Sequence, residues 1–185
     1  DAHLLAGAAA VARAAVGSGL LGLTLDLEVA RRIDLLGCVY TMMRSHRARA
    51  ARGEFYTPPG VAETMAQMAL GGLEPGQSIC DPTAGTGGLL RAAASTLRAD
   101  GRDPHDYVWA GCDIAPVAVA GLAVNAHIWG LGHQVVIGCA DSLAEPDWPA
   151  RAMREQREAT EAQRSRVRTA HAISATRVLL AGGSS

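Results

Sequence analysis

The sequence predicts an α/β fold that has a partial, mostly parallel sheet and an N-terminal helical extension. Three short apolar runs, at residues 78–80, 108–112 and 135–138, have the length of buried strands. Helical stretches separate these runs, which is the spacing of βαβ crossover units. We therefore divide the chain into an N-terminal helical segment, 1–52, and an α/β domain, 53–185.

Composition and charge narrow the classes of function. The 17 basic residues are all Arg and balance 18 acidic residues, so the sequence lacks the overall positive field of a simple nucleic-acid binder. There is no signal-peptide pattern and no uninterrupted apolar run of about 18 residues, so we expect a cytoplasmic protein that does not contact membranes. The four cysteines have no CxxC spacing, and we expect them to be buried, reduced thiols.

The N-terminal segment has a helical pattern and few chemically informative residues. Residues 2–16 are rich in Ala and end at a Gly-Ser-Gly break. From Asp26 to Met43, apolar residues recur at three- and four-residue spacing, which predicts an amphipathic helix. This helix leads into a basic run that contains Arg47 and Arg49. The run is typical of a solvated helix end, and the alternative is contact with DNA phosphates.

The α/β domain alternates helices and strands in order. A helix is predicted over Pro59–Leu70, because Pro stands at its start and two glycines follow its end. Further helices are predicted over Leu89–Ala99 and Val117–Trp129, between the strand-like runs. Residues 150–170 form a charged helix, and the short apolar run 177–181 is a candidate for a fourth strand.

The strongest local signal is the loop Asp-Pro-Thr-Ala-Gly-Thr-Gly-Gly at residues 81–88, between a strand and a helix. Its glycines allow the backbone to turn sharply and to approach a ligand. Leu90 stands where a dinucleotide fingerprint needs Gly or Ala, and a Walker loop needs a Lys that this chain lacks. Asp81 at the loop entrance suits a cationic ligand group. The alternative is a purely structural turn.

Two more carboxylates follow the next two strands. Asp113 is placed to bind the hydroxyls of a ribose, and Ile114 to cover one face of an adenine. Asp141, after the third strand, is placed to accept from an adenine amine. The carboxyl ends of parallel strands meet at one edge of a sheet, so these acids and Asp81 predict one nucleoside-binding site.

The loop at residues 81–88, together with Gly-Glu-Phe-Tyr-Thr-Pro at residues 53–58, resembles the adenine-specific N-6 DNA methylases. Modification subunits of type I restriction systems and short methylase-like proteins of phages and mobile elements are the most similar members. The resemblance covers roughly residues 30–143 and implies a Rossmann-like S-adenosylmethionine-dependent methyltransferase core. DNA and a partner chain are the partners that it implies.

The resemblance also implies a role for each residue of the cofactor site. Tyr56 and Thr57 would close over the methionine end of S-adenosylmethionine. Asp113 would bind the ribose hydroxyls, and Asp141 would lie at the adenine. The amino acid and the sulfonium would be held by the loop after the first strand, at Asp81, Thr83, Gly85 and Gly87.

The sequence departs from the family at its catalytic motif, Asn/Asp-Pro-Pro-Tyr/Phe, which holds the amine of the flipped adenine. The one Asn, Asn125, falls in a predicted helix, and the one Pro-Pro pair, Pro58-Pro59, lies in the upstream loop. We predict no catalytic residue, and we expect the chain to end before any target-recognition domain. On its own it is not expected to methylate DNA.

Three functions therefore remain open. The chain is the cofactor-binding part of an enzyme that a partner chain completes, or a catalytically inactive module that binds and regulates. A different nucleotide-binding Rossmann domain is disfavoured by the glycine spacing. A metal site is not expected, because no ligand stands at a suitable spacing from His127 or His133.

Overall fold

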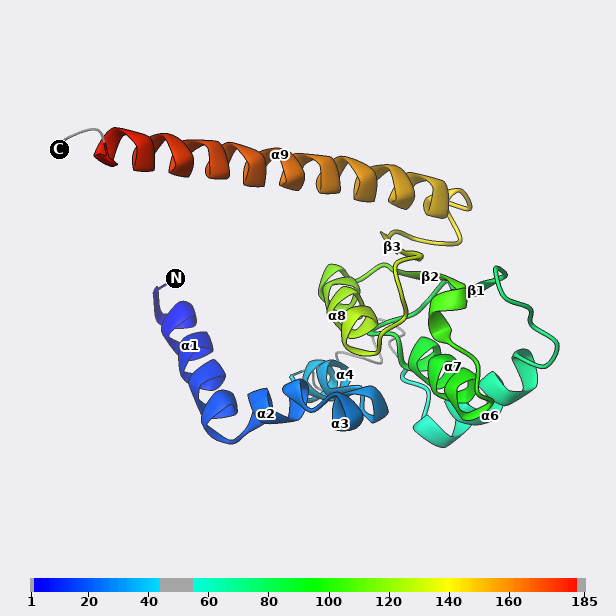
Figure 1. Ribbon diagram of the computed structural model, residues 1–185. Coiled ribbons are helices and arrows are strands. Elements are labelled where there is room, and N and C mark those ends of the chain that lie inside the picture. The colour runs from blue at the N-terminus through cyan, green and yellow to red at the C-terminus, as the bar shows by residue number, and fades with distance from the viewer. Residues whose placement is uncertain (1, 44–54, 183–185) are drawn as a thin grey trace.

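The computed structural model describes residues 2–43 and 55–182 (Figure 1). The N-terminal part is helical, as the sequence predicts, and consists of α1 (Ala2–Gly17), α2 (Leu20–Leu25), α3 (Leu27–Arg32) and α4 (Leu35–Met42). The α/β part that follows begins with a helix and alternates strands with helices: α6 (Pro59–Ala69), β1 (Ser78–Asp81), α7 (Gly88–Ala99), η1 (Pro104–Asp106), β2 (Val108–Asp113), α8 (Pro116–Ile128), β3 (Val135–Cys139) and α9 (Trp148–Gly182).

The three strands form a parallel sheet in the order β1-β2-β3. Asp81 at the end of β1 pairs with Gly111, and Asp113 at the end of β2 pairs with Cys139. The carboxyl ends of all three strands therefore lie along one edge of the sheet. The predicted α/β fold with a parallel sheet is confirmed.

Strand β2 packs against a different helical layer on each face. Trp109 belongs to the larger core cluster, together with Leu97 of α7 and Leu122 of α8. The next residue, Ala110, points the other way and packs with Trp148 of α9. Figure 1 shows α7 and α8 on one side of the sheet and α9 on the other. The alternation of side chains along a strand thus produces a three-layer arrangement.

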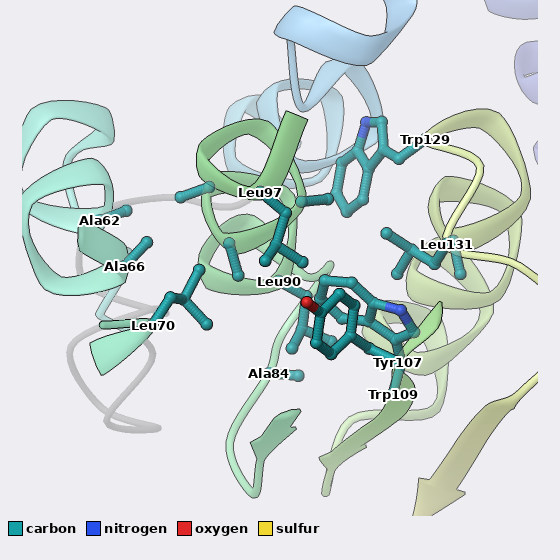
Figure 2. Close-up of a cluster of buried hydrophobic side chains, with 14 of the residues drawn as sticks. Ala62, Ala66, Leu70, Ala84, Leu90, Leu97, Tyr107, Trp109, Trp129 and Leu131 are labelled. Atoms are coloured by element: carbon teal, nitrogen blue, oxygen red, sulfur yellow. The ribbon is translucent and has the colours of Figure 1, made fainter. Parts of the chain in front are cut away.

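Three large aromatic side chains belong to the core cluster: Trp109 and Tyr107 lie near the strands, and Trp129 lies beside α7 on the side of the N-terminal helices (Figure 2). Trp109, Trp129 and Tyr107 are almost completely buried. The Trp109 indole donates to the carbonyl of Pro104 at 2.9 Å, so its polar atom is satisfied in the core. Trp129 follows α8 and belongs to the same core cluster.

The helix predicted from Asp26 to Met43 is in fact two helices, α3 and α4. Asp26 caps α3 by accepting from the backbone of Glu28 and Val29, and Asp34 caps α4 by accepting from Gly37 N at 2.8 Å. Between them Ile33 is extended, with φ −123° and ψ 135°. An Asp side chain accepts from backbone N–H groups that would otherwise bond within the helix. Asp34 therefore ends α3 and caps a new helix, although the apolar pattern continues through this position.

The fourth strand predicted at residues 177–181 is wrong, because these residues belong to α9. Neither Gly nor Pro occurs from residue 150 to residue 181, and Ala, Arg and Glu favour the helix over this whole stretch. The predicted burial of the cysteines is confirmed only for Cys112, whose pKa is raised mainly by burial. Cys80 and Cys139 lie on edge strands and Cys38 lies in α4, where it lines the open pocket described below, and all three are exposed.

Substitution of Gly87 by Ala is expected to destabilise the fold by about 2–4 kcal/mol, because left-handed backbone and overpacking add. Gly87 has φ +97°, and a Cβ there would lie 2.6 Å from Leu122 Cδ1 and 2.9 Å from Trp129 Cζ3. Gly88→Ala is the matched control, since nothing lies within 4 Å of its Cβ position. Chemical denaturation of both variants measures the difference, and equal stabilities would contradict this account of the turn.

Candidate functional site

A pocket of about 650 Å³ opens at the carboxyl edge of the sheet. This volume lies within the range of roughly 300–1,000 Å³ that is usual for small-molecule sites. Residues after all three strands line it, together with Phe55–Thr57 and with residues from α3 and α4. The pocket is thus walled by the sheet edge and by the N-terminal helices.

Of the nine predicted site residues, eight line this pocket: Tyr56, Thr57, Asp81, Thr83, Gly85, Asp113, Ile114 and Asp141. The ninth, Gly87, lies behind the loop, where it caps α7 and packs against Leu122 and Trp129. Its role in the turn is structural. Arg47 and Arg49, which the sequence suggests as DNA contacts, lie outside the described residues.

Asp81 is a buried acid at the entrance of the loop. Its side chain is only 8% exposed, and its Oδ1 accepts from Thr83 N at 3.0 Å. Burial raises the pKa of Asp81 above its ordinary value, the hydrogen bond from Thr83 opposes this, and the charge of Asp113 adds to the increase. A cationic ligand group would offset the cost of this buried charge.

Asp113 connects the loop after β1 to the loop after β2. Its Oδ2 accepts from Gly85 N at 2.8 Å, and its Oδ1 accepts from Ala115 N at 2.8 Å. An ionised carboxylate offers about four acceptor sites, so each oxygen retains capacity for a ligand hydroxyl. Asp113 therefore fixes the shape of the glycine loop and also presents acceptors to the pocket.

The third acid, Asp141, lies on a more open part of the rim. Its Oδ1 accepts from the backbone of Leu143 at 3.1 Å and of Ala144 at 3.3 Å, which holds the turn after β3. Two apolar side chains of the pocket lining are largely exposed beside it, Ile114 at 69% and Leu143 at 94%. This side of the pocket combines an acceptor with apolar surface, as a heterocyclic base requires.

The ring of Tyr56 lies close to the glycine loop. A Cβ at Gly85 would lie 3.6 Å from Tyr56 Cε1, so the ring passes close to the loop backbone. The Tyr56 ring also meets the ring of Tyr40 edge to face, with centroids 6.3 Å apart. Tyr40 belongs to α4, so the aromatic wall of the pocket is shared between the N-terminal helices and residues 55–58.

Sequence reasoning missed the contributions of α3, α4 and α7 to the pocket. Arg91 of α7 is 7% exposed, donates from Nη1 to the carbonyl of Arg32 at 2.9 Å, and lies 3.8 Å from Glu63. These three residues and Asp34 all line the pocket. The caps of α3 and α4 have a local signal, an Asp before an apolar run. The long-range hydrogen bond from Arg91 to the Arg32 carbonyl has no local sequence signal.

The described part of the chain contains no group of three or more His, Cys, Asp or Glu side chains that fits a metal ion. Within the same residues, no helix is long and apolar enough to cross a membrane. Among the buried charged residues are one acid, Asp81, and one base, Arg91, and both line the pocket.

Two solved structures are similar to parts of this chain. A type I restriction-modification methyltransferase subunit from Streptococcus thermophilus is 32% identical, with a TM-score of 0.47, over 52% of this chain and 20% of that one. A protein from Listeria monocytogenes, described as a class I S-adenosylmethionine-dependent methyltransferase, is 22% identical, with a TM-score of 0.37. That match covers 43% of this chain and 24% of that protein. The chain therefore spans a quarter or less of either protein.

A family model gives the longer match. It covers residues 31–162, which include the three strands, the glycine loop and every residue that lines the pocket. The match begins at Arg31, in the last turn of α3, so the joint between α3 and α4 lies inside it. The chain belongs to the N-6 DNA methylase family.

Proposed function

We propose that the pocket binds S-adenosylmethionine and that this chain is the cofactor-binding part of an adenine-specific N-6 DNA methyltransferase. The observation that carries the proposal is the convergence of Asp81, Asp113 and Asp141 on one pocket beside the glycine loop. Membership of the N-6 DNA methylase family supports the same ligand. The donors and acceptors fit a nucleoside joined to an amino acid.

At the amino-acid end, opposite charges are available. Asp81 is a buried acceptor for an ammonium group, and Arg91 is a buried donor for a carboxylate. A free amino acid end is a zwitterion, so one acid and one base on the wall match it. Tyr56 and Thr57 cover this end in the proposal, and Thr83 and Gly85 present the loop backbone to it.

At the nucleoside end, Asp113 holds the ribose hydroxyls and Asp141 accepts from the adenine amine. Ile114 and Leu143 supply the apolar surface for the ring. When bound, the cofactor supplies an electrophilic methyl group on its sulfonium. This chain's residues hold and orient it, and the proposal assigns no residue of this chain to the target base. DNA, reached in part through Arg47 and Arg49, and a partner chain complete the enzyme in this proposal.

A catalytically inactive binding module is the second candidate. It is favoured by the absence of an Asn-Pro-Pro or Asp-Pro-Pro sequence in these 185 residues. Transfer of a labelled methyl group to DNA separates the two candidates. Incorporation above that of an Asp113→Ala control excludes the inactive module.

Calorimetric titration with S-adenosylmethionine and with S-adenosylhomocysteine is expected to give micromolar binding. Asp113→Ala is expected to weaken the binding of each ligand by about 1–3 kcal/mol, because the charged acceptor for the ribose hydroxyls is lost. Asp103→Ala is the control, since Asp103 caps η1 through His105 N and lies outside the pocket lining. Absence of binding at millimolar ligand would overturn the proposed function.

Asp81→Asn is expected to stabilise the ligand-free protein at neutral pH and to weaken binding of S-adenosylhomocysteine. Because burial raises the pKa of Asp81, its ionisation costs stability once the pH exceeds the unfolded pKa. The wild type is therefore expected to lose stability relative to Asp81→Asn as the pH rises between the unfolded and the folded pKa. Denaturation at a series of acidic and neutral pH values measures this difference, and a constant difference would contradict it.

A further inference from the structure

One polar cluster joins the N-terminal helices to the glycine loop and is not part of the roles assigned above. At its centre is Asp34, between α3 and α4. Its Oδ1 accepts from Gly37 N and from Asn125 Nδ2, both at 2.8 Å, and its Oδ2 accepts from Thr86 Oγ1 at 2.6 Å. Asn125 also donates to the carbonyl of Thr86 at 2.9 Å. Both Thr86 and Asn125 are 2% exposed.

The packing around this cluster leaves little space for a side chain at two neighbouring glycines, Gly37 and Gly121. A Cβ at Gly37 would lie 2.2 Å from Asp34 Oδ2 and 2.6 Å from Thr86 Oγ1. On the other side of Thr86, a Cβ at Gly121 of α8 would lie 3.2 Å from Thr86 Cγ2. The Thr86 side chain is therefore held between α4 and α8, and both helices come close to it because they carry Gly at these positions.

Thr86 stands between the two loop glycines that have positive φ, Gly85 at +57° and Gly87 at +97°. Glycines leave the loop many alternative conformations, so contacts have to select one of them. On one side of Thr86, Gly85 N donates to Asp113. On the other side, Gly87 N donates to the carbonyl of Ala84 at 2.7 Å. Asp34 thus fixes the middle of the loop in two ways: it accepts directly from Thr86, and it accepts from Asn125, which itself donates to the Thr86 carbonyl.

We propose that Asp34 is a positioning residue for the cofactor pocket, which holds the glycine loop and the α3–α4 wall as one unit. The inference rests on the proposed function, because it concerns the affinity of the same pocket. Asp34 acts through Thr86 and through the placement of α4, which brings Tyr40 against Tyr56. Loss of the Asp34 carboxylate loosens the loop and weakens ligand binding without removing any ligand contact of the nucleoside end.

The test compares Asp34→Ala with Asp26→Ala. Both substitutions remove an Asp that caps a helix of the same segment, but Asp26 caps only α3 through Glu28 and Val29 and does not line the pocket. Thr86→Val removes the same link while it keeps the shape of the side chain. It provides a second variant if Asp34→Ala does not fold.

Two measurements are made on each variant. Without ligand, hydrogen exchange at the Gly85 and Gly87 amides is expected to accelerate in Asp34→Ala and in Thr86→Val, and to stay unchanged in Asp26→Ala. With S-adenosylhomocysteine, the Kd of Asp34→Ala and of Thr86→Val is expected to rise roughly tenfold. Asp34→Ala leaves buried donors without their acceptor, and Thr86→Val leaves the Asp34 carboxylate without one of its donors.

The outcomes separate this inference from the proposed function. Unchanged loop exchange in Asp34→Ala and in Thr86→Val overturns the positioning role, whatever the affinities. Faster loop exchange with an unchanged Kd also overturns it, because the loop would then not set affinity. If the wild type does not bind S-adenosylhomocysteine, the proposed function is overturned. If its loop amides are nevertheless protected from exchange and Asp34→Ala removes this protection, the structural link between Asp34 and the loop remains supported.

Discussion

Three consecutive residues at the joint between α3 and α4 attach the N-terminal helices to the α/β domain. The carbonyl of Arg32 accepts from Arg91, the carbonyl of Ile33 accepts from the Trp129 indole at 3.4 Å, and the carboxylate of Asp34 accepts from Thr86 and Asn125. The extended backbone at Ile33 frees carbonyls that a continuous helix would use internally. The break in the helix is therefore what allows the segment to form a wall of the pocket.

The pocket also depends on how buried polar groups are satisfied. The chain places an acid and a base, Asp81 and Arg91, where water is largely excluded, and each has partners within the protein. Such groups cost stability unless they are paired, and an apolar pair in their place would often be as stable. Both residues line the pocket, where the proposed function uses their charges, and Arg91 also holds the end of α3.

Much of the site was accessible from the sequence because it follows local rules. Asp81, Asp113 and Asp141 each follow an apolar run, and a parallel sheet brings the ends of its strands to one edge. The wall from α3 and α4 was not accessible. Asp34 contacts residues 52 and 91 positions away in the chain, and no local pattern encodes such distances. The length of α9 was missed for a different reason, since the apolar residues 178–181 match a strand as well as a helix when they are considered alone.

Amide NMR of the whole chain, titrated with S-adenosylhomocysteine, tests the central claim most directly. Gly85, Ala115 and Leu143 each donate a backbone hydrogen bond to an acid of the pocket, and they come from the loops after three different strands. If the three strand ends form one ligand site, these three amides shift together along a single binding curve. Shifts confined to other elements, or three amides that respond with different affinities, would contradict a single site.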